Sequence, residues 1–469
     1  MVGCRRLRLG DFDNDGLPDV FIPQGWNDGQ NRNVLFHNDG GGRFTRVTQG
    51  RVATDTSVAY GASWGDYDGD GWLDLFVPNE NTSAGPSGPK VKSFLYHNEG
   101  DGTFSHITNG VVAGFEGFAN AATWGDVNND GRLDLFVSSF GGLSTLYENQ
   151  GEGQFEGILQ NITGAPIGAS FGDFDNDGSF DLIVGNAFAS VFFLRNETGN
   201  LEWVGSPASD DRRSLGCAWG DYDNDGWLDL FVPHTSSFNS GGSDNNDALY
   251  HNNGDGTFTP LARGSFSFDA RNNDSATWGD FNDDGFLDLF VGTVDGKSGF
   301  YVNNGNTNHW LAFNLKATVS NRSAIGAKVR VKATIAGRSL EQLRQVSGGE
   351  GWCSQGDPRP HFGLGDATVA EKVRIEWPSG QVQELTNVAT NQFHTVIEPG
   401  GPPTLKVAIV ASAFRLTLTG EANAPYELQS APDLASWQPV TNVTANAEGL
   451  VSYETQADQA HRFYRAVKR

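Results

Sequence analysis

The stretch WGDYDNDGWLDLFVP, residues 219–233, places an aspartate-rich turn between an aromatic–glycine pair and a short apolar run. Its centre follows the nine-residue pattern D-x-[DN]-x-D-G-x-x-D. The glycine permits a sharp turn, because it has no side chain to clash in that conformation. The apolar run after the last aspartate has the length and composition of a buried strand. We therefore expect an aspartate loop between two strands.

Six copies of this pattern organise the first 300 residues, and their starts lie 55, 60, 47, 48 and 59 residues apart. In most units a further strand follows the loop and ends in an Asn/Gly/Asp turn, as in FLYHNEGDGTF at 94–104, which is a hairpin signal. The copies are DFDNDGLPD at 11–19, DYDGDGWLD at 66–74, DVNNDGRLD at 126–134, DFDNDGSFD at 173–181, DYDNDGWLD at 221–229 and DFNDDGFLD at 280–288.

Each unit reads as about four short strands, and one such sheet cannot bury both of its faces alone. Stacking the sheets radially solves this problem. We therefore predict an all-β chain: a β-propeller of six visible blades, or seven, followed by small β-sandwich-like domains. Few residues precede Asp11. The ring must close through a later segment, around Trp310, or through a seventh blade upstream.

An aromatic residue and a glycine precede most copies of the loop. We interpret these side chains as core between neighbouring blades, and a sugar-stacking platform is the alternative. The residues are Leu9, in the first copy, and Trp64, Trp124, Phe171, Trp219 and Trp278.

The aspartates suit calcium, which takes about six to eight oxygen ligands in a flexible shell. Side chains at positions 1, 3 and 5 of the loop point inward, position 7 offers its backbone carbonyl, and the aspartate at position 9 closes the site. We predict about six Ca²⁺ sites. Their ligands are Asp11, Asp13, Asp15, Leu17 and Asp19; Asp66, Asp68, Asp70, Trp72 and Asp74; Asp126, Asn128, Asp130, Arg132 and Asp134; Asp173, Asp175, Asp177, Ser179 and Asp181; Asp221, Asp223, Asp225, Trp227 and Asp229; and Asp280, Asn282, Asp284, Phe286 and Asp288.

Other interpretations of the loops fit less well. An EF-hand needs flanking helices and a glutamate at position 12, where this chain has Ile22 or a valine inside an apolar run. Magnesium demands strict octahedral geometry and keeps its waters. A solvated turn without an ion would hold carboxylates together against a repulsion of roughly 4 kcal/mol at a separation of about 4 Å. The aspartates that would bind metal then account for a large part of the formal charge of −25.

These loops and their flanking strands resemble FG-GAP/VCBS repeats, the blade unit of integrin α-subunit-type propellers. The resemblance covers about residues 1–307. It implies that the loop aspartates and asparagines at matching positions bind calcium.

From Asn308 the repeat stops, and residues 308–399 resemble the ASPIC/UnbV domain that commonly follows such repeats in the cartilage acidic protein family. Among the matching residues, Asp357, Arg359 and His361 suggest catalysis, but no base, nucleophile and oxyanion donor can be assigned together. We expect an internally paired loop. The matching residues are Asn321, Arg322, Ile325 to Ala327, Ser354, Asp357, Arg359 and His361 to Gly365.

A proline-stiffened linker follows at 400–404. Residues 405–469 read as short strands and are similar to the small β-sandwich appended to secreted bacterial proteins.

Composition narrows the class of protein. We see no basic patch that would displace counterions from nucleic acid, and no apolar run of the roughly 18 residues that a membrane span requires. Cys4, Cys217 and Cys353 lie far apart, so we expect free, partly buried thiols. The N-terminus has no signal-peptide core. Because this conflicts with secretion, we expect the sequence to begin inside the first unit.

We predict a secreted, extracellular or cell-surface calcium-binding propeller that is no enzyme and that mediates adhesion or binds an extracellular protein or glycan ligand. The insertions at 79–92 and 234–247, near the calcium loops, are the candidate contact surface, because loops on rigid scaffolds commonly carry recognition. A lectin-like propeller would expose aromatic side chains there, and Phe238 is the only one. A polysaccharide-acting enzyme would need a further site, and the sequence has no HExxH motif. His37, His97 and His251 occupy equivalent turn positions, which indicates repeat architecture.

Overall fold

The computed structural model contains two compact units, residues 1–314 with 320–394, and residues 315–319 with 395–469. Nearly every described element is a strand, and the exception is the single-turn helix α1 (Arg51–Thr54). The structure describes residues 7–24, 32–80, 92–140, 144–160, 162, 164–187, 191–197, 199–205, 213–235, 247–261, 272–293, 298–352, 354–400, 404–410, 413–419, 424–431, 437–445, 450–456 and 463–468.

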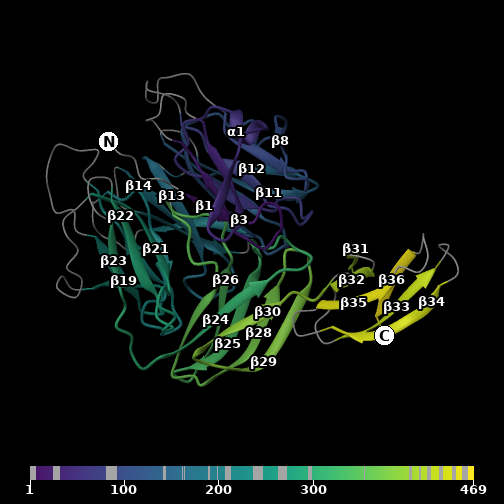
Figure 1. Ribbon diagram of the computed structural model, residues 1–469. Coiled ribbons are helices and arrows are strands. Elements are labelled where there is room, and N and C mark those ends of the chain that lie inside the picture. The colour runs from purple at the N-terminus through teal and green to yellow at the C-terminus, as the bar shows by residue number, and fades with distance from the viewer. Residues whose placement is uncertain are drawn as a thin grey trace. The chain divides into compact units, whose positions relative to one another are not determined.

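Six antiparallel sheets follow one another in chain order through the first unit (Figure 1). Each sheet uses strands that are consecutive in the sequence, which is the meander expected of a propeller blade. The prediction of an all-β propeller is confirmed. The blades are β1 (Arg8–Gly10), β2 (Asp19–Ile22), β3 (Val34–Gly40) and β4 (Arg43–Val47); β5 (Ser63–Gly65), β6 (Asp74–Val77), β7 (Phe94–Asn98) and β8 (Phe104–Ile107); β9 (Ala119–Gly125), β10 (Asp134–Ser139), β11 (Ser144–Gly151) and β12 (Gln154–Gln160); β13 (Pro166–Gly172), β14 (Asp181–Asn186), β15 (Phe192–Glu197) and β16 (Asn200–Gly205); β17 (Ala218–Gly220), β18 (Asp229–Val232), β19 (Ala248–Asn252) and β20 (Phe258–Pro260); and β21 (Asn273–Gly279), β22 (Asp288–Thr293) and β23 (Gly299–Tyr301).

The aspartate loop joins the first and second strands of each blade. In blade 2 the pairing of these strands ends where Gly65 faces Asp74, so the loop closes the hairpin. Because antiparallel strands alternate in direction, the connection between the second and third strands lies at the opposite end of the blade.

The insertions 79–92 and 234–247 are such second-to-third connections, since they join β6 to β7 and β18 to β19. The described ends of both insertions therefore lie at the blade end opposite the aspartate loops, and not near them as expected. Residues 81–91 and 236–246, with Phe238, lie outside the described residues.

The aromatic residue before each of loops 2 to 6 packs against the preceding blade, whereas Leu9, at the same place before loop 1, is 41% exposed. A Cβ atom on Gly65 would lie 2.8 Å from the ring of Trp124, so only glycine leaves room for that ring. Tyr67, the second residue of the loop in blade 2, stacks on the same indole, with ring centroids 6.3 Å apart. The interpretation of these aromatics as core between blades is confirmed.

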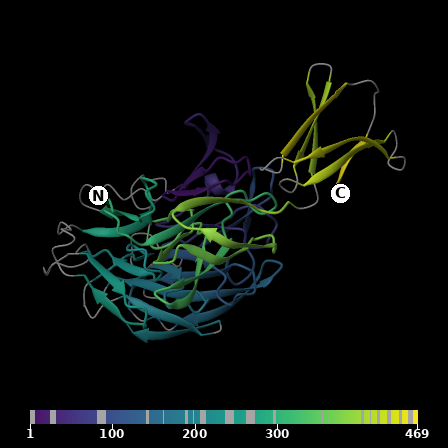
Figure 2. The same cartoon turned by 90° about the horizontal axis from the view of Figure 1, so that it is seen from below.

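Residues 308–394, here called the cap domain, form two further antiparallel sheets. Figures 1 and 2 show these sheets, in green, at one end of the blade array. Buried side chains such as Phe313, Val331 and Phe362 fill the domain. The strands are β27 (His361–Gly365), β24 (His309–Lys316) and β30 (Gln392–Ile397) in one sheet, and β26 (Arg338–Gln345), β25 (Lys328–Ile335), β28 (Val369–Glu376) and β29 (Val382–Ala389) in the other.

Residues 346–360, here called the axial loop, extend from the cap domain into the centre of the blades. The carbonyl of Gly348 accepts a hydrogen bond from the amide of Trp64 at 3.1 Å, and the amide of Gly351 donates to Ala169 at 2.7 Å. Since Trp64 and Ala169 belong to the innermost strands of blades 2 and 4, the loop runs along the axis on which the blades converge.

Trp310 belongs to the cap domain and not to the ring. It lies in β24, which pairs with β27 and β30, and its ring packs against His361 and Phe393 with centroids 6.1 and 5.0 Å away. Closure of the ring through this segment is therefore wrong.

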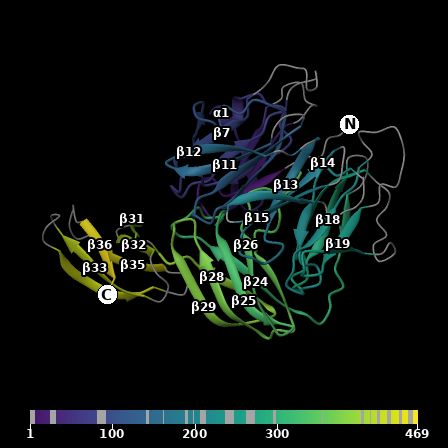
Figure 3. The same ribbon diagram turned by 180° about the vertical axis from the view of Figure 1, so that it is seen from behind.

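The second unit contains two three-stranded sheets, shown in yellow in Figure 3. Leu416 and Leu418 of one sheet pack with Tyr426 and Leu428 of the other, as in a β-sandwich. The strands are β31 (Thr404–Val410), β32 (Ala413–Thr419) and β35 (Leu450–Gln456), and β34 (Gln438–Thr444), β33 (Pro425–Ala431) and β36 (Phe463–Lys468).

Candidate metal centres

Each aspartate loop holds its first and last carboxylates in the interior. In blade 2, Asp66 accepts hydrogen bonds from the amides of Gly69 and Gly71 at 2.9 and 3.0 Å. Asp74 accepts bonds from the amides of Tyr67 and Asn98 at 3.2 and 2.9 Å. The equivalent carboxylates are buried in all six loops: Asp11, Asp66, Asp126, Asp173, Asp221 and Asp280 at position 1, and Asp19, Asp74, Asp134, Asp181, Asp229 and Asp288 at position 9.

The backbone of the loop explains the pattern at positions 4 and 6. Position 4 adopts a left-handed conformation, with φ of 58° at Asn224, and position 6 is also left-handed, with φ of 96° at Gly226. Asparagine and aspartate tolerate this region, and glycine enters it without strain. The resulting coil turns the side chains of positions 1, 3 and 5 toward one centre.

The structure brings the predicted ligands of positions 1, 3 and 5 together. In blades 1 and 2 one carboxylate oxygen from each of these aspartates lies within 4.8 Å of the others. In blade 2 Asp70 also accepts the amide of Trp72, the position-7 residue, at 2.9 Å. Where position 3 is asparagine, its side-chain oxygen faces the same way, since Asn282 accepts the amide of Asp284 at 3.0 Å.

Burial and mutual repulsion strongly raise the pKa values of these carboxylates. Burial raises the pKa of Asp66 to about 8, and the nearby charges of Asp74, Asp70 and Asp68 add to the shift. Burial likewise raises the pKa of Asp181 to about 9. Without a compensating cation, these groups would therefore bind protons near neutral pH.

Basic side chains lie beside the aspartates of several loops. The sequence pattern did not predict this contact. In blade 2, His97 Nδ1 lies 3.2 Å from both Asp68 and Asp74. His37 and His251 occupy the same place in blades 1 and 5. The common place of each histidine, directly before the asparagine of the next hairpin turn, was the signal that could have indicated this contact.

The cap domain supplies further cations to the loop end of the blades. The ammonium of Lys328 contacts Asp126, the first carboxylate of loop 3. Arg359 forms an ion pair with Asp283 in loop 6 at 2.6 Å. The loops therefore differ in how much positive charge already reaches them.

The donor set of the loops fits a hard divalent cation. Carboxylate and amide oxygens are the ligands that Ca²⁺ prefers, and the loops concentrate them around one point. In loops 1, 2 and 5, positions 1, 3, 5 and 9 would hold the ion, which would supply the charge that the carboxylates lack.

Of the residues that suggested catalysis, Asp357 and Arg359 are paired with one another as expected, whereas His361 lies in β27 and contacts a backbone carbonyl of loop 6. Arg359 bonds both carboxylate oxygens of Asp357, at 3.0 Å from Nε. His361 is buried with Nε2 3.0 Å from the carbonyl oxygen of Gly285. Burial lowers its pKa to about 4.

The other residues that match the ASPIC/UnbV pattern stabilise turns or touch the loops. Asn321 bonds both the amide and the carbonyl of Ile325 at 2.9 Å. The amide of Arg322 donates to Asn14 in loop 1 at 2.8 Å. Ser354 donates to the carbonyl of Glu350 at 3.0 Å.

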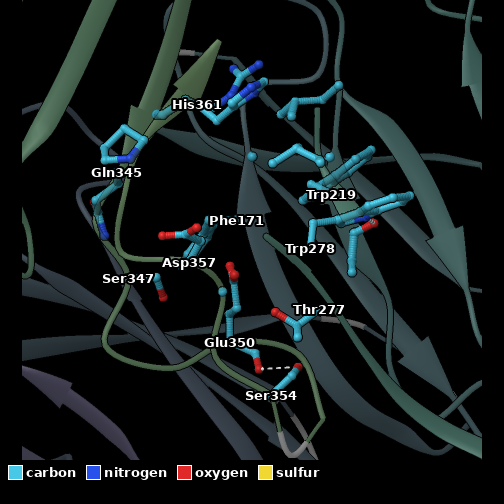
Figure 4. Close-up of a pocket in the computed structure, with 18 of the residues that line it drawn as sticks. Phe171, Trp219, Thr277, Trp278, Gln345, Ser347, Glu350, Ser354, Asp357 and His361 are labelled. Carbon is cyan, nitrogen blue, oxygen red and sulfur yellow. Dashed lines mark hydrogen bonds between the residues drawn. The ribbon is translucent and has the colours of Figure 1, made fainter. Parts of the chain in front are cut away.

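A cavity of about 130 Å³ lies between the axial loop and the inner strands of blades 3 to 6 (Figure 4). Trp219 and Trp278 line it on the blade side, and Glu350 and Asp357 line it on the axial-loop side. Glu350 accepts a hydrogen bond from Ser170 at 3.0 Å, and Asp357 is paired with Arg359. Both carboxylates therefore already hold protein partners.

Of the three cysteines, Cys217 is a free, buried thiol, and Cys4 and Cys353 lie outside the described residues. In the described part of the chain no helix has the length and apolar character needed to span a membrane.

The blades, their aspartate loops and the cap domain define the class: a propeller of repeated blades joined to a second β-domain. The family model described as FG-GAP-like repeat matches residues 11–77, 84–137, 126–184, 173–232 and 238–291, more than half of the chain. The chain therefore belongs to the FG-GAP-like repeat family. The model described as ASPIC and UnbV matches residues 317–403.

Among curated proteins, the chain is similar to cartilage acidic protein 1 of Homo sapiens, with 26% identity over 335 residues. The match covers 69% of this chain and 41% of that protein. The proteins of that name from Mus musculus and Xenopus tropicalis are 26% and 25% identical, over 69% and 70% of this chain and 42% and 43% of their own lengths. The matched region thus spans less than half of these relatives.

Two solved structures are similar at lower identity. BBS1N in complex with ARL6DN matches 82% of this chain and 91% of its own, with a TM-score of 0.39 and 10% identity. YCF48 bound to D1 peptide matches 64% and 93%, with a TM-score of 0.33 and 12% identity.

Proposed function

We propose that this chain is an extracellular, calcium-loaded binding scaffold that mediates adhesion or holds a protein or glycan ligand. The observation that carries the proposal is the burial of two carboxylates in each of six equivalent loops. Burying ionised groups without a partner is costly, and a divalent cation removes that cost.

A structural role for the ions follows from their position. Asn14 of loop 1 donates to the carbonyl of Gly71 in loop 2 at 2.9 Å, and Asn176 of loop 4 donates to Gly226 in loop 5 at 3.0 Å. An ion that fixes one loop therefore fixes the contact to the next blade. Calcium would hold the ring in one geometry rather than take part in a reaction.

The partner surface would then lie at the blade end away from the loops. Cap-domain residues such as Lys328 and Arg359 already contact the aspartate loops. The insertions 79–92 and 234–247 connect strands at the other end. This arrangement supports recognition there, on a scaffold stiffened from the loop side.

A ligand array tests the binding function. The full chain would be applied to extracellular matrix proteins and glycans in calcium and in chelator. We expect binding that is lost in chelator and restored when calcium is returned. A variant with residues 81–91 replaced by a Gly/Ser segment of equal length should lose the ligand and keep its melting temperature.

Two results would contradict the proposal. One is binding that persists unchanged in chelator. The other is a hydrolytic activity that needs no calcium, because a scaffold performs no chemistry.

A further inference from the structure

The cavity between the axial loop and the blades is lined by an arginine that forms no ion pair with the described residues. Arg344 lies in β26 of the cap domain, and its guanidinium carbon is 5.4 Å from the ring centroid of Phe362. Nη1 donates to the carbonyl of Leu343 at 2.9 Å, and Nη2 donates to the side-chain oxygen of Gln342 at 3.3 Å. Both acceptors are neutral. A guanidinium stays charged and has five N–H donors, so Arg344 can still bind an anion.

The loop carboxylates near Arg344 do not replace such an anion. Asp221 accepts the amides of Asp225 and Gly226 at 3.0 and 2.9 Å, so its oxygens already serve its own loop. Burial lowers the pKa of Arg344, whereas the charges of Asp221 and Asp173 raise it. Because burial has the larger effect, the guanidinium loses more by leaving water than it gains from these aspartates. A bound anion would offset that loss.

His361, which also lines the cavity, has an unused hydrogen-bond acceptor. Its Nε2 lies 3.0 Å from the carbonyl oxygen of Gly285, so Nε2 carries the proton and donates it. Burial lowers the pKa of His361 to about 4, which keeps the ring neutral. Nδ1 is therefore an acceptor, and among the described residues it is buried without a partner. A donor group on a ligand would satisfy it.

A carboxylate and two indoles complete the lining (Figure 4). Glu350 accepts the neutral hydroxyl of Ser170 at 3.0 Å, and no cation of the described chain forms an ion pair with it. Trp219 and Trp278 supply apolar surface on the blade side. The cavity volume of about 130 Å³ is close to the roughly 150 Å³ that holds benzene in another protein. The space therefore suits a molecule of roughly six to eight non-hydrogen atoms.

We propose that this cavity binds a small organic acid that also carries a hydrogen-bond donor, which is the chemistry of an α-amino or α-hydroxy acid. Arg344 would bind the carboxylate, since a guanidinium matches that group with two parallel hydrogen bonds. Glu350 and His361 Nδ1 would accept from the donor, and the indoles would contact the apolar part of the ligand. This site is separate from the proposed scaffold function, and it does not depend on whether the loops bind calcium.

A series of matched ligands tests these roles on the full chain. L-valine, 2-hydroxy-3-methylbutanoate, 3-methylbutanoate and 2-methylpropylamine share a branched carbon chain and differ in the carboxylate and the donor. Titration calorimetry in calcium would measure each, and other small amino and hydroxy acids would vary the apolar part. We expect the acids with a donor to bind, 3-methylbutanoate to bind more weakly, and the amine not to bind. Tighter binding of the amino acid than of the hydroxy acid would assign its ammonium to Glu350.

Arg344→Met removes the guanidinium and keeps an unbranched apolar side chain. We expect the acids to bind at least about tenfold more weakly to this variant, because hydrogen bonds to charged groups are among the stronger ones. Arg338→Met is the matched control, since Arg338 is exposed at the start of the same strand, β26. It should bind the acids as the unchanged protein does.

Glu350→Gln and Ser347→Phe keep the proposal testable if Arg344→Met fails to fold. Glu350→Gln retains an oxygen for Ser170, and it should remove any preference for the amino acid over the hydroxy acid. Ser347 lines the cavity from the axial loop, so a phenyl group there should fill the space and abolish binding. The proposal is wrong if none of the acids binds the unchanged protein. It is equally wrong if folded Arg344→Met or Ser347→Phe binds them with unchanged affinity.

Discussion

Asp66 and Asp74 hold positions in blade 2 that are unfavourable for an ionised carboxylate. Burial raises the pKa of Asp66 to about 8, and burial also raises the pKa of Asp74 to about 7 although His97 lies beside it. A proton, a protein cation such as His97 or a metal ion would offset the charge of these groups. A proton would satisfy one group, whereas a divalent ion satisfies several at once. The geometry favours the ion.

Asp70→Asn tests the ion at the level of one ligand. Asp70 accepts the amide of Trp72 at 2.9 Å through one oxygen, which the amide side chain of asparagine retains. We expect the variant to bind one calcium ion fewer per chain. Loss of a site filled at about 100 times its Kd would lower the stability in calcium by roughly 2.7 kcal/mol. Metal analysis and calcium-dependent melting would measure both.

Asp101→Asn is the control for that variant, because Asp101 is exposed in a hairpin turn and bonds Thr103 within the same turn. It should bind the full number of ions. If Asp70→Asn does so too, the ligand assignment in loop 2 is wrong.

The raised pKa values also predict how stability depends on pH. In chelator the folded chain binds protons at Asp66, Asp74 and Asp181 that the unfolded chain has already released above about pH 4. Stability in chelator should therefore fall as the pH rises from about 5 to about 9. Calcium should stabilise most at the upper end, because protons no longer compete for the carboxylates. Melts across this range with and without calcium would measure the difference. A chelated protein whose stability rises over the range would contradict the prediction.

Single residues were predictable where the repeat itself specifies them. The nine-residue pattern located each buried carboxylate, because the same local coil occurs six times. Lys328 was not predictable, since it contacts Asp126 from 202 positions away in the sequence. Such a contact depends on how the cap domain docks, and no local pattern records that.

At the scale of elements, the strands were predictable and the axial loop was not. Alternation and turn residues indicate each blade hairpin, as in β5 to β8. Residues 346–360 show no strand or helix periodicity, because their contacts go to the inner strands of several blades, such as β5 at Gly348 and β13 at Gly351. The end of the blade at which the insertions begin could have been predicted from the alternation of strand direction alone.

Gly348→Ala tests whether the axial loop holds the blades together. A Cβ atom there would lie 2.0 Å from the carbonyl oxygen of Trp64, so the loop or β5 must move. Overpacking of this kind typically costs about 1–3 kcal/mol. We expect a lower melting temperature and faster proteolysis near the axial loop.

Ser347→Ala is the neighbouring control and should change stability little, since the hydroxyl of Ser347 accepts one long hydrogen bond, at 3.3 Å, from Gly349. If Gly348→Ala has the same melting temperature as the unchanged protein, the loop does not support the inner strands.

At the scale of the whole molecule, the loops and the cap domain act on the same end of the ring. The loops contact one another from blade to blade, as Asn14 contacts Gly71, and the cap domain contacts loops 1, 3 and 6. The stabilising effects of ions in separate loops should therefore combine through shared contacts. The exposed edge between blades 6 and 1 interrupts this series of contacts between loops.

Metal removal tests this coupling in the full chain. Each ion at about 100 times its Kd contributes roughly 2.7 kcal/mol, so the loss of several together should lower the melting temperature far more than Asp70→Asn does. Calcium added back stepwise should restore it, and magnesium at equal concentration should restore less, because it gives up its waters reluctantly. Calorimetry before and after exhaustive chelation would measure the change. An identical melting temperature in both states would mean that the buried carboxylates are held by protons and protein cations alone, and the calcium-loaded scaffold would have to be abandoned.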